Sequence, residues 1–286
     1  MRGISQSLQQ AFVIAGILSL ALAATAQCKF TTLNIPGAVT STAIGVNDQG
    51  AIVGAFTSSN TDNRGFLLFQ GKFTHFNFPG AESTEANDIN NVGQIVGQYD
   101  NLQTGQHGFV VHNGVFHSIS APAAPSQTRA IGINNFGVIV GVAGSFGFRL
   151  SSGHFTTVRF PGSTRTTASG INDSGVIVGT YGDTTGFNHG FMLKNGSYTT
   201  INFPGATNTS VFRIDNEGDI VGSYDINGGD EHGFTLDKGR FLTHDEPNAG
   251  MATFILDVNK FDTIVGGFVD VGEHNRSFKA TCTGVF

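Results

Sequence analysis

The stretch INNVGQIVGQYD, residues 89–100, has a near copy in INDSGVIVGTYGD, residues 171–183. The shared element occurs six times, and its copies begin at Val46, Ile89, Ile133, Ile171, Ile214 and Val258. The last glycine of each copy falls at residues 54, 97, 141, 179, 222 and 266, so successive copies lie 43, 44, 38, 43 and 44 residues apart. Periods of this size are typical of solenoids, propellers and other repeat arrays.

Each repeat contains four short apolar runs bounded by Gly, Asn, Asp or Pro, a pattern that predicts strands. The Asn-x-x-Gly element predicts a turn in which Asn bonds its own backbone and Gly adopts the left-handed conformation. The sixth copy has Asp262 in place of this glycine, a residue that adopts the conformation at some cost. The adjacent Ile and Val of the IVG motif indicate a strand that is covered on both faces.

Aromatic residues recur with the same period in two of the four runs. The third run carries Phe66, Phe109, Phe148, Phe191, Phe234 and Phe278. The fourth run begins with Phe30, Phe73, Phe116, Phe155, Tyr198 and Phe241. We interpret both series as packing between sheets rather than as a cofactor site, and burying each ring contributes about 1.5–3 kcal/mol. Four-stranded units of about 43 residues that pack face to face predict an all-β fold, a six-bladed β-propeller.

The two ends of the chain predict how the ring closes. The segment CKFTTLNI, residues 28–35, resembles a fourth run, and RSFKATC, residues 276–282, resembles a third run. The N-terminal strand is therefore expected to complete the sixth blade. Cys28 and Cys282, the only two cysteines, occupy positions that are neighbours in a hairpin of the second repeat. A disulfide between them is expected, with free thiols as the alternative, and would stabilise the fold by up to ~5 kcal/mol on the chain-entropy model.

Residues 1–26 have the features of a secretory signal peptide. Arg2 precedes an apolar run from Ala11 to Ala23, and Ala24-Thr25-Ala26 fits a signal-peptidase site. A transmembrane anchor is the alternative, but the run has 13 residues where a span needs ~20. We expect residues 27–286 to form a single propeller domain that is secreted or periplasmic and does not insert into the membrane.

Composition and charge exclude one class of partner. The chain of 286 residues is 13% charged, carries a formal net charge of −6 and has no block of Lys and Arg. Nucleic-acid-binding proteins normally show a clustered basic face, so nucleic acid is excluded as a partner. We expect a monomer whose partner is an extracellular glycan or a surface protein.

Three motifs together resemble a known class of repeat. FPGA at residues 78–81 and 203–206, the IN-D/N-x-G-x-IVG element and HGF at His107, His189 and His232 are similar to the HAF-type extracellular repeats of secreted bacterial proteins. The resemblance covers nearly all of residues 30–278. It implies secretion and a propeller-like repeat, and it brings no catalytic residues. The departures are a shortened loop, GSFGF, in the third copy and PNAG for FPGA in the sixth.

The sequence contains no recognised catalytic motif such as G-x-S-x-G, H-E-x-x-H or a P-loop. The histidine of HGF is interpreted as a structural hydrogen bond to a nearby loop, because Arg64 and Arg276 hold the same position and arginine is not a metal ligand. Asp225, Asn227 and Asp230 supply the oxygen ligands that calcium takes, but the segment misses the EF-hand pattern, and we favour a solvated turn over a calcium site. No other cofactor is expected.

Two groups of residues are candidates for binding a ligand. Asp88, Arg213 and Asp257 occupy positions near the axis where other copies have glycine, and departures from a repeat's own rule can mark function. Sequence drift in a water-filled channel is the alternative explanation. Tyr99, Tyr181 and Tyr224 lie near loops rich in hydroxyl and amide groups, such as residues 80–86, 162–168 and 205–211, a composition suited to sugars.

The sequence favours a secreted, non-enzymatic module that binds extracellular carbohydrate or another cell-surface component. One alternative is a hydrolase or lyase with a single polar site in the channel, and another is a structural protein–protein scaffold. Fold alone does not choose among these functions.

Overall fold

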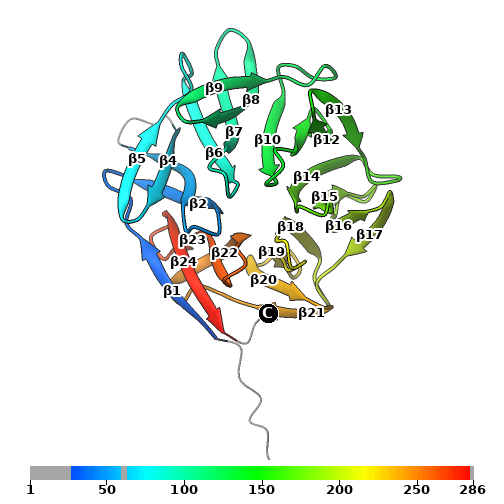
Figure 1. The fold of residues 1–286 in the computed structure, drawn as a ribbon. Coiled ribbons are helices and arrows are strands. Elements are labelled where there is room, and N and C mark those ends of the chain that lie inside the picture. The colour runs from blue at the N-terminus through cyan, green and yellow to red at the C-terminus, as the bar shows by residue number, and fades with distance from the viewer. Residues whose placement is uncertain (1–26, 59–62, 284–286) are drawn as a thin grey trace, which may run out of the picture.

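Six four-stranded antiparallel sheets surround a central axis in the computed structural model, which describes residues 27–58 and 63–283 (Figure 1). The fold is the six-bladed β-propeller that the repeat predicts. The described residues contain strands and turns and no helix, so none that could cross a membrane occurs among them. The predicted signal peptide, residues 1–26, lies outside the described residues.

The strands of each blade follow chain order from the axis outward, except in the sixth. Blade 1 comprises β2 (Thr40–Val46), β3 (Ile52–Thr57), β4 (Asn63–Phe69) and β5 (Lys72–Phe76). Blade 2 comprises β6 (Ser83–Ile89), β7 (Ile95–Asn101), β8 (Gly105–His112) and β9 (Val115–Ile119). Blade 3 comprises β10 (Thr128–Ile133), β11 (Ile139–Ala143), β12 (Phe146–Ser151) and β13 (His154–Val158).

The second half of the ring repeats this order. Blade 4 comprises β14 (Arg165–Ile171), β15 (Ile177–Gly182), β16 (Asn188–Lys194) and β17 (Ser197–Ile201). Blade 5 comprises β18 (Asn208–Ile214), β19 (Ile220–Asp225), β20 (His232–Asp237) and β21 (Arg240–Thr243). Blade 6 comprises β22 (Ala249–Val258), β23 (Thr263–Asp270), β24 (Asn275–Thr283) and, outermost, β1 (Gln27–Leu33).

The ring closes in blade 6, where β1 pairs antiparallel with β24. Figure 1 shows the first strand beside the last one at the outer edge of the ring. Cys28 and Cys282 face each other in this register and form a disulfide across a sequence separation of 254 residues. Both predictions about the ends of the chain are therefore confirmed.

The periodic phenylalanines of the third strands form the core between blades. Five of these rings are fully buried and the sixth is 3% exposed. Each also contacts the aromatic residue of the fourth strand in its own blade, as in the pair Phe30 and Phe278, whose ring centroids lie 5.1 Å apart. Packing between sheets, and not a cofactor site, explains the period.

The glycine of the IVG motif is required by a close backbone approach. In blade 2, Gly97 of β7 faces Ala86 of β6, beside a bulge at which the register shifts between Ala86 and Asp88. A Cβ atom on Gly97 would lie only 2.0 Å from the carbonyl oxygen of Glu85. The same approach recurs in every blade. By contrast, Gly93 of the Asn-x-x-Gly turn has a φ of 83°, and Asp262, which replaces it in blade 6, keeps the left-handed conformation at 55°.

The asparagine of each turn also connects neighbouring blades. Its Oδ1 accepts N–H groups of its own turn, and its Nδ2 donates to the carbonyl oxygen of the equivalent residue in the next blade. These bonds join Asn47 to Asn90, Asn90 to Asn134, Asn134 to Asn172, Asn172 to Asp215, and Asn259 to Asn47, at 2.9–3.2 Å. Blade 5 has Asp215 here, and an ionised carboxylate has no proton to donate. Among the described residues, this ring of bonds is therefore interrupted only between blades 5 and 6.

Candidate functional site

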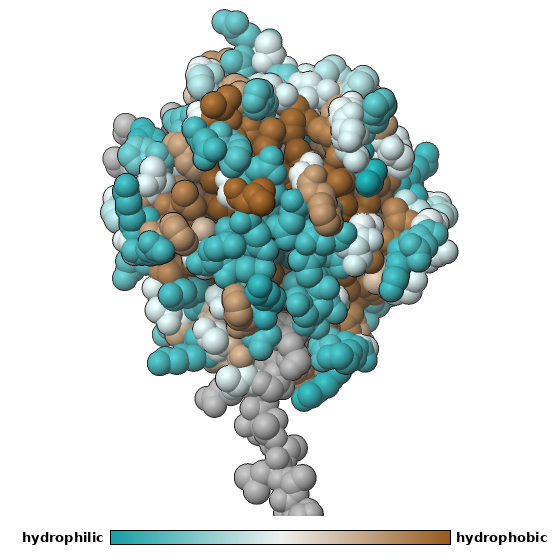
Figure 2. Space-filling view, in the orientation of Figure 1, coloured by the Kyte–Doolittle hydropathy of each residue, from teal (hydrophilic) through white to brown (hydrophobic). Residues whose placement is uncertain are grey.

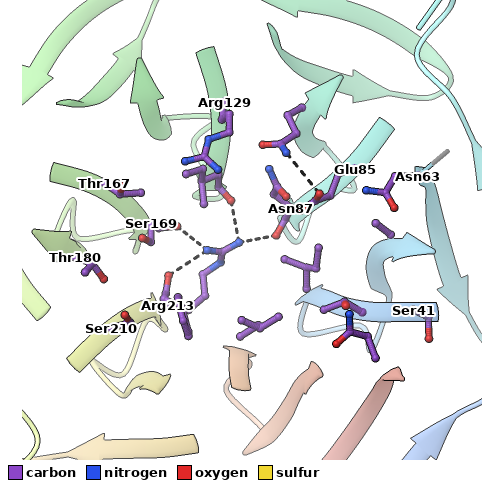
Figure 3. Close-up of a pocket in the computed structure, with 18 of the residues that line it drawn as sticks. Ser41, Asn63, Glu85, Asn87, Arg129, Thr167, Ser169, Thr180, Ser210 and Arg213 are labelled. Carbon is purple, nitrogen blue, oxygen red and sulfur yellow. Dashed lines mark hydrogen bonds between the residues drawn. The ribbon is translucent and has the colours of Figure 1, made fainter. Parts of the chain in front are cut away.

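A cavity of about 560 Å³ opens at one mouth of the central channel (Figure 3). It lies between the inner strands of the blades, where successive residues of a strand point to opposite faces. The volume falls in the range of ~300–1,000 Å³ that is typical of small-molecule sites. We call this space the mouth cavity.

The wall of the mouth cavity is polar, and its deeper part is largely apolar. Equivalent positions in five inner strands form the wall: Thr42, Glu85, Arg129, Thr167 and Ser210. The bulged residues lie deeper: Ile44, Asn87, Ile131, Ser169, Phe212 and Leu256. A ligand in this cavity therefore meets hydroxyl, guanidinium and carboxyl groups at the side and apolar groups below.

Arg213 forms the floor of the mouth cavity. Its Nη1 donates to the carbonyl oxygen of Ser169 at 2.6 Å, and its Nη2 donates to those of Asn87 at 2.5 Å and Ile131 at 2.8 Å. These acceptors belong to blades 4, 2 and 3, and the residue is only 4% exposed. The guanidinium therefore joins four blades and closes the channel.

Asp88 and Asp257 lie against the Nε atom of the same arginine, at 3.6 and 4.0 Å from their nearest carboxyl oxygens. Both are buried, and they line a smaller pocket of about 80 Å³ at the opposite mouth. The three residues that the sequence identifies near the axis therefore meet. Their carboxyl groups, however, lie on the other side of Arg213 from the mouth cavity.

Each of these carboxyl groups is held by backbone. Asp88 accepts the N–H groups of Ile89 and Ile133 at 2.7 and 2.8 Å. Asp257 accepts two N–H groups in the same way, from the inner strands of blades 1 and 6. Burial raises the pKa of both carboxyls, and the nearby charge of Asp88 raises that of Asp257 further, while Arg213 opposes the rise. The geometry indicates a structural ion cluster that ties blades together.

The smaller pocket is lined mainly by asparagine and aspartate from the blade-connecting turns. Figure 2 shows hydrophilic residues gathered over the centre of one face of the ring. Side-chain amides and carboxylates in this pocket bond to one another, as Asn91 Nδ2 does to Asp48 Oδ2 at 2.7 Å. With little space and polar groups engaged in the ring of turns, this mouth offers less to a ligand than the mouth cavity.

Glu85 and Arg129 project toward the open centre from neighbouring inner strands (Figure 3). Gln98 Nε2 lies 3.5 Å from Glu85 Oε2. Burial raises the pKa of the Glu85 carboxyl, and the charge of Arg129 acts against the rise. Within the described residues the guanidinium of Arg129 donates no hydrogen bond, so its donors are free for a ligand.

Arg165 lies at the rim of the mouth cavity, at the start of the inner strand of blade 4. Its Nη2 donates to Asn188 Oδ1 at 2.6 Å. Its side chain covers Gly182, since a Cβ atom there would lie 3.0–3.2 Å from Arg165 Cγ, Nε and Cζ. The absence of a side chain at residue 182 thus leaves room for this arrangement.

Sequence reasoning found the segments that form this wall but not its charged residues. Glu85 and Arg165 belong to the loop segments 80–86 and 162–168. The available signal was a second departure from the repeat, because the positions of Glu85 and Arg129 hold Thr or Ser in blades 1, 4 and 5.

The three tyrosines pack within the blades instead of facing the mouth cavity. Tyr99, Tyr181 and Tyr224 each stack on the phenylalanine of an FPG motif, with ring centroids 3.6–3.7 Å apart. Tyr99 and Tyr224 are buried, and all three hydroxyls bond to a Ser or Thr of the fourth strand. With one face of each ring covered by phenylalanine, we do not assign them a role as sugar platforms.

The calcium candidates form a turn that satisfies its own polar groups. Asp225 is buried and accepts Gly228 N–H at 2.9 Å and Asn208 Nδ2 at 2.8 Å. Asn227 has a φ of 57°, so it adopts the left-handed conformation of the turn. Among the described residues, no group of three or more His, Cys, Asp or Glu is arranged to hold a metal ion.

Two of the three histidines of the HGF motif bond to the loop that precedes their strand, as expected, whereas His232 bonds through Nδ1 to Asp245. His107 Nε2 lies 2.9 Å from Thr104 Oγ1, and His189 Nε2 lies 3.2 Å from Asp183 Oδ2. Their Nδ1 atoms bond to Ser120 and Asn202. A structural role is therefore confirmed for both.

No protein-family model and no curated protein matches the sequence, so the HAF-type resemblance stays a prediction. Solved structures do match. A catalytically inactive virginiamycin B lyase from Staphylococcus aureus with quinupristin has a TM-score of 0.54 and 13% identity, covering 89% of this chain and 99% of that one. The gluconolactonase XC5397 from Xanthomonas campestris has a TM-score of 0.55 and 11% identity, covering 90% of each chain.

A third similar structure is a lectin. The fucose-specific lectin from Aleuria aurantia has a TM-score of 0.51 and 11% identity, covering 88% of this chain and 96% of that one. At these identities the likeness shows the fold alone. The fold occurs in proteins named for binding and in proteins named for catalysis.

Proposed function

We propose that this protein is an exported carbohydrate-binding propeller whose ligand enters the mouth cavity. The observation that carries the proposal is the lining of that cavity, where hydroxyl and charged groups from several blades surround apolar residues such as Ile131 and Phe212. Sugars present many hydroxyl groups and some apolar C–H surface, so they match a cavity with both kinds of lining.

Two further observations support export and a binding role. The disulfide between Cys28 and Cys282 is of the kind that persists in oxidising compartments. The carboxyl groups of Asp88 and Asp257 are engaged with backbone and lie beneath Arg213, so they are not placed to react with a ligand in the mouth cavity.

The test is a glycan and polysaccharide array probed with protein comprising residues 27–286, with and without calcium. We expect saturable binding to related sugars. Thr167→Tyr, which fills the mouth cavity, should abolish it, whereas Thr199→Tyr on the exposed outer strand of the same blade should not. Equal loss in both variants, or no binding by folded and oxidised protein, would refute the proposal. A stable protein complex recovered by crosslinking would then favour a scaffold.

A hydrolase or lyase is the second candidate, and Glu85 favours it. Its carboxyl lies in the cavity wall, and burial raises its pKa, as for a general acid or base. If the protein cleaves the sugar it binds, Glu85→Gln should remove turnover while keeping most of the binding. Unchanged turnover in that variant, or none in the wild type, would exclude this role for Glu85.

A further inference from the structure

The mouth cavity carries excess positive charge although the chain as a whole is acidic. The formal net charge is −6, yet the charged side chains among the described residues that line the cavity are Arg129, Arg165, Arg213 and Glu85. Three of the four are arginine. The local charge therefore has the opposite sign to that of the whole protein.

These arginines differ in how many bonds they make to other groups of the protein. Arg213 is buried, and its Nη atoms donate to backbone carbonyl oxygens while Asp88 and Asp257 face its Nε. Arg165 donates one bond to Asn188 and is exposed at the rim. Arg129 is half-buried in the wall and, within the described residues, donates to no protein group. Free guanidinium donors thus face the cavity from two neighbouring blades, 3 and 4.

Among the described residues, Glu85 is the one carboxyl that lines the cavity, and it does not bond directly to Arg129 or Arg165. Its hydrogen bond is to Gln98, and no Glu85–Arg129 or Glu85–Arg165 ion pair occurs among the described residues. The arginines therefore stay available to an anion, and Glu85 is left to contact sugar hydroxyls.

Guanidinium groups recognise planar carboxylates and tetrahedral oxyanions through paired N–H donors. Binding is strengthened where water is partly excluded, as in a cavity wall. The remaining lining, with Thr42, Thr167 and Ser210, suits the hydroxyl groups of a sugar.

We infer that the ligand is an anionic saccharide whose carboxylate or sulfate group is bound by Arg129, with Arg165 at the rim as the second contact. The inference rests on the proposed function, since it specifies the class of carbohydrate that enters the mouth cavity. It excludes a neutral sugar as the preferred ligand.

The test is titration calorimetry with three probes: an oligogalacturonate of a few sugar units, its carboxyl-reduced neutral form, and a sulfated disaccharide from heparin. The inference predicts that an acidic probe binds at least about tenfold more tightly than the neutral one, because hydrogen bonds to charged groups are stronger than those between neutral groups. Its affinity should fall as salt rises. The two acidic probes distinguish carboxylate from sulfate as the anionic group.

Variants then locate the anion. Arg129→Gln should weaken acidic binding by about tenfold or more and so remove the preference for the acidic over the neutral probe, with a smaller effect from Arg165→Gln at the exposed rim. Arg149→Gln in β12 is the control, since it removes the same charge from blade 3 outside the cavity.

The outcomes separate the two proposals. Binding of neutral and acidic probes with equal affinity, insensitive to Arg129→Gln, would overturn the anionic ligand and keep the carbohydrate-binding function. No binding of any saccharide on the array or by calorimetry would overturn both. Acidic binding that Arg129→Gln and Arg149→Gln weaken equally would also overturn the inference, because it would reflect net charge and not this cavity.

Discussion

Arg213 in blade 5 donates through Nη2 to the carbonyl oxygen of Asn87 in blade 2, on the opposite side of the channel, at 2.5 Å. The two residues are 126 positions apart in the chain. This bond spans the axis, as do the contacts of the same guanidinium with Ile131 in blade 3 and Asp88 in blade 2, whereas the asparagines of the turns join neighbouring blades. The same guanidinium also closes the mouth cavity, so the stability of the ring and the shape of the site depend on one side chain.

We expect Arg213→Met to lower the free energy of unfolding by about 3–5 kcal/mol, because the change leaves buried carbonyl and carboxyl groups without their partner. Arg213→Lys should also destabilise, since one ammonium group cannot replace the planar guanidinium. Urea denaturation followed by circular dichroism measures both. Arg149→Met on β12 is the control and should change little. An unchanged midpoint for Arg213→Met would contradict the role of this residue as an axial tie.

The disulfide predicts that the oxidised protein is considerably more stable to unfolding than the reduced protein. Replacing Cys28 and Cys282 together by serine should lower the free energy of unfolding by about 5 kcal/mol at most, because the bridge closes a loop of 254 residues in the unfolded chain. Wild-type protein in reductant should unfold at the same urea concentration as the double variant. If oxidised and reduced wild type unfold alike, the bridge does not stabilise the closed ring.

Asp215 interrupts the ring of hydrogen bonds between the turns of neighbouring blades, and its carboxyl predicts that the stability of the protein depends on pH. Burial raises the pKa of its carboxyl to about 6, and the charge of Glu217 adds to the rise. The protonated form is therefore favoured in the folded state, so this group contributes stability at pH 4 that is lost as pH rises through about 6. Asp219, whose pKa burial and the charges of Asp215 and Asp237 raise to about 7, acts in the same direction.

Asp215→Asn should supply the missing donor for the carbonyl of Asn259 and remove the charge. We expect it to stabilise the protein by about 1–2 kcal/mol at pH 7, a value reduced for partial exposure of the turn, and by little at pH 4. Asn172→Asp is the reciprocal variant and should lose stability at pH 7 but not at pH 4.

The Asp215→Asn and Asn172→Asp variants are each compared with wild type at pH 4 and at pH 7, because other groups also titrate between these two pH values. His244 is one, since burial lowers its pKa to about 4. An Asp215→Asn gain that is equal at pH 4 and pH 7 would show that the charge of Asp215 is not the cause.

The glycine of the IVG motif predicts a severe effect of a single methyl group. In Gly97→Ala the new Cβ would lie 2.0 Å from the Glu85 carbonyl oxygen, so the inner two strands of blade 2 must separate. We expect a loss of about 3 kcal/mol or more, measured by urea denaturation. Gly229→Ala, whose nearest atom is 3.1 Å away in an exposed loop, should cost far less. Comparable losses in the two variants would argue against the close approach as the reason for the motif.

The sequence alone determined the number of blades, the four strands in each and the closure of the ring by the N-terminus. The reason is physical repetition: residues such as Gly97, Asn90 and Phe109 meet the same local demand in each blade, a close approach, a turn or a packed ring. Because each blade has the same structural requirement, the same residue types recur in the sequence about every 43 residues. The disulfide could also be predicted, because Cys28 and Cys282 occupy positions that are neighbours in a hairpin of the second repeat.

Only the tertiary structure decided what the individual departures from the period do. Asp88, Arg213 and Asp257 stood out in the sequence, but their meeting beneath the mouth cavity depends on the ring bringing blades 2, 5 and 6 to one axis. Arg129 and Glu85 occupy ordinary polar positions in the sequence, and only the closed ring shows that these positions line the cavity. The orientation of a long side chain depends on space and partners that distant segments create, and a sequence period carries no record of them.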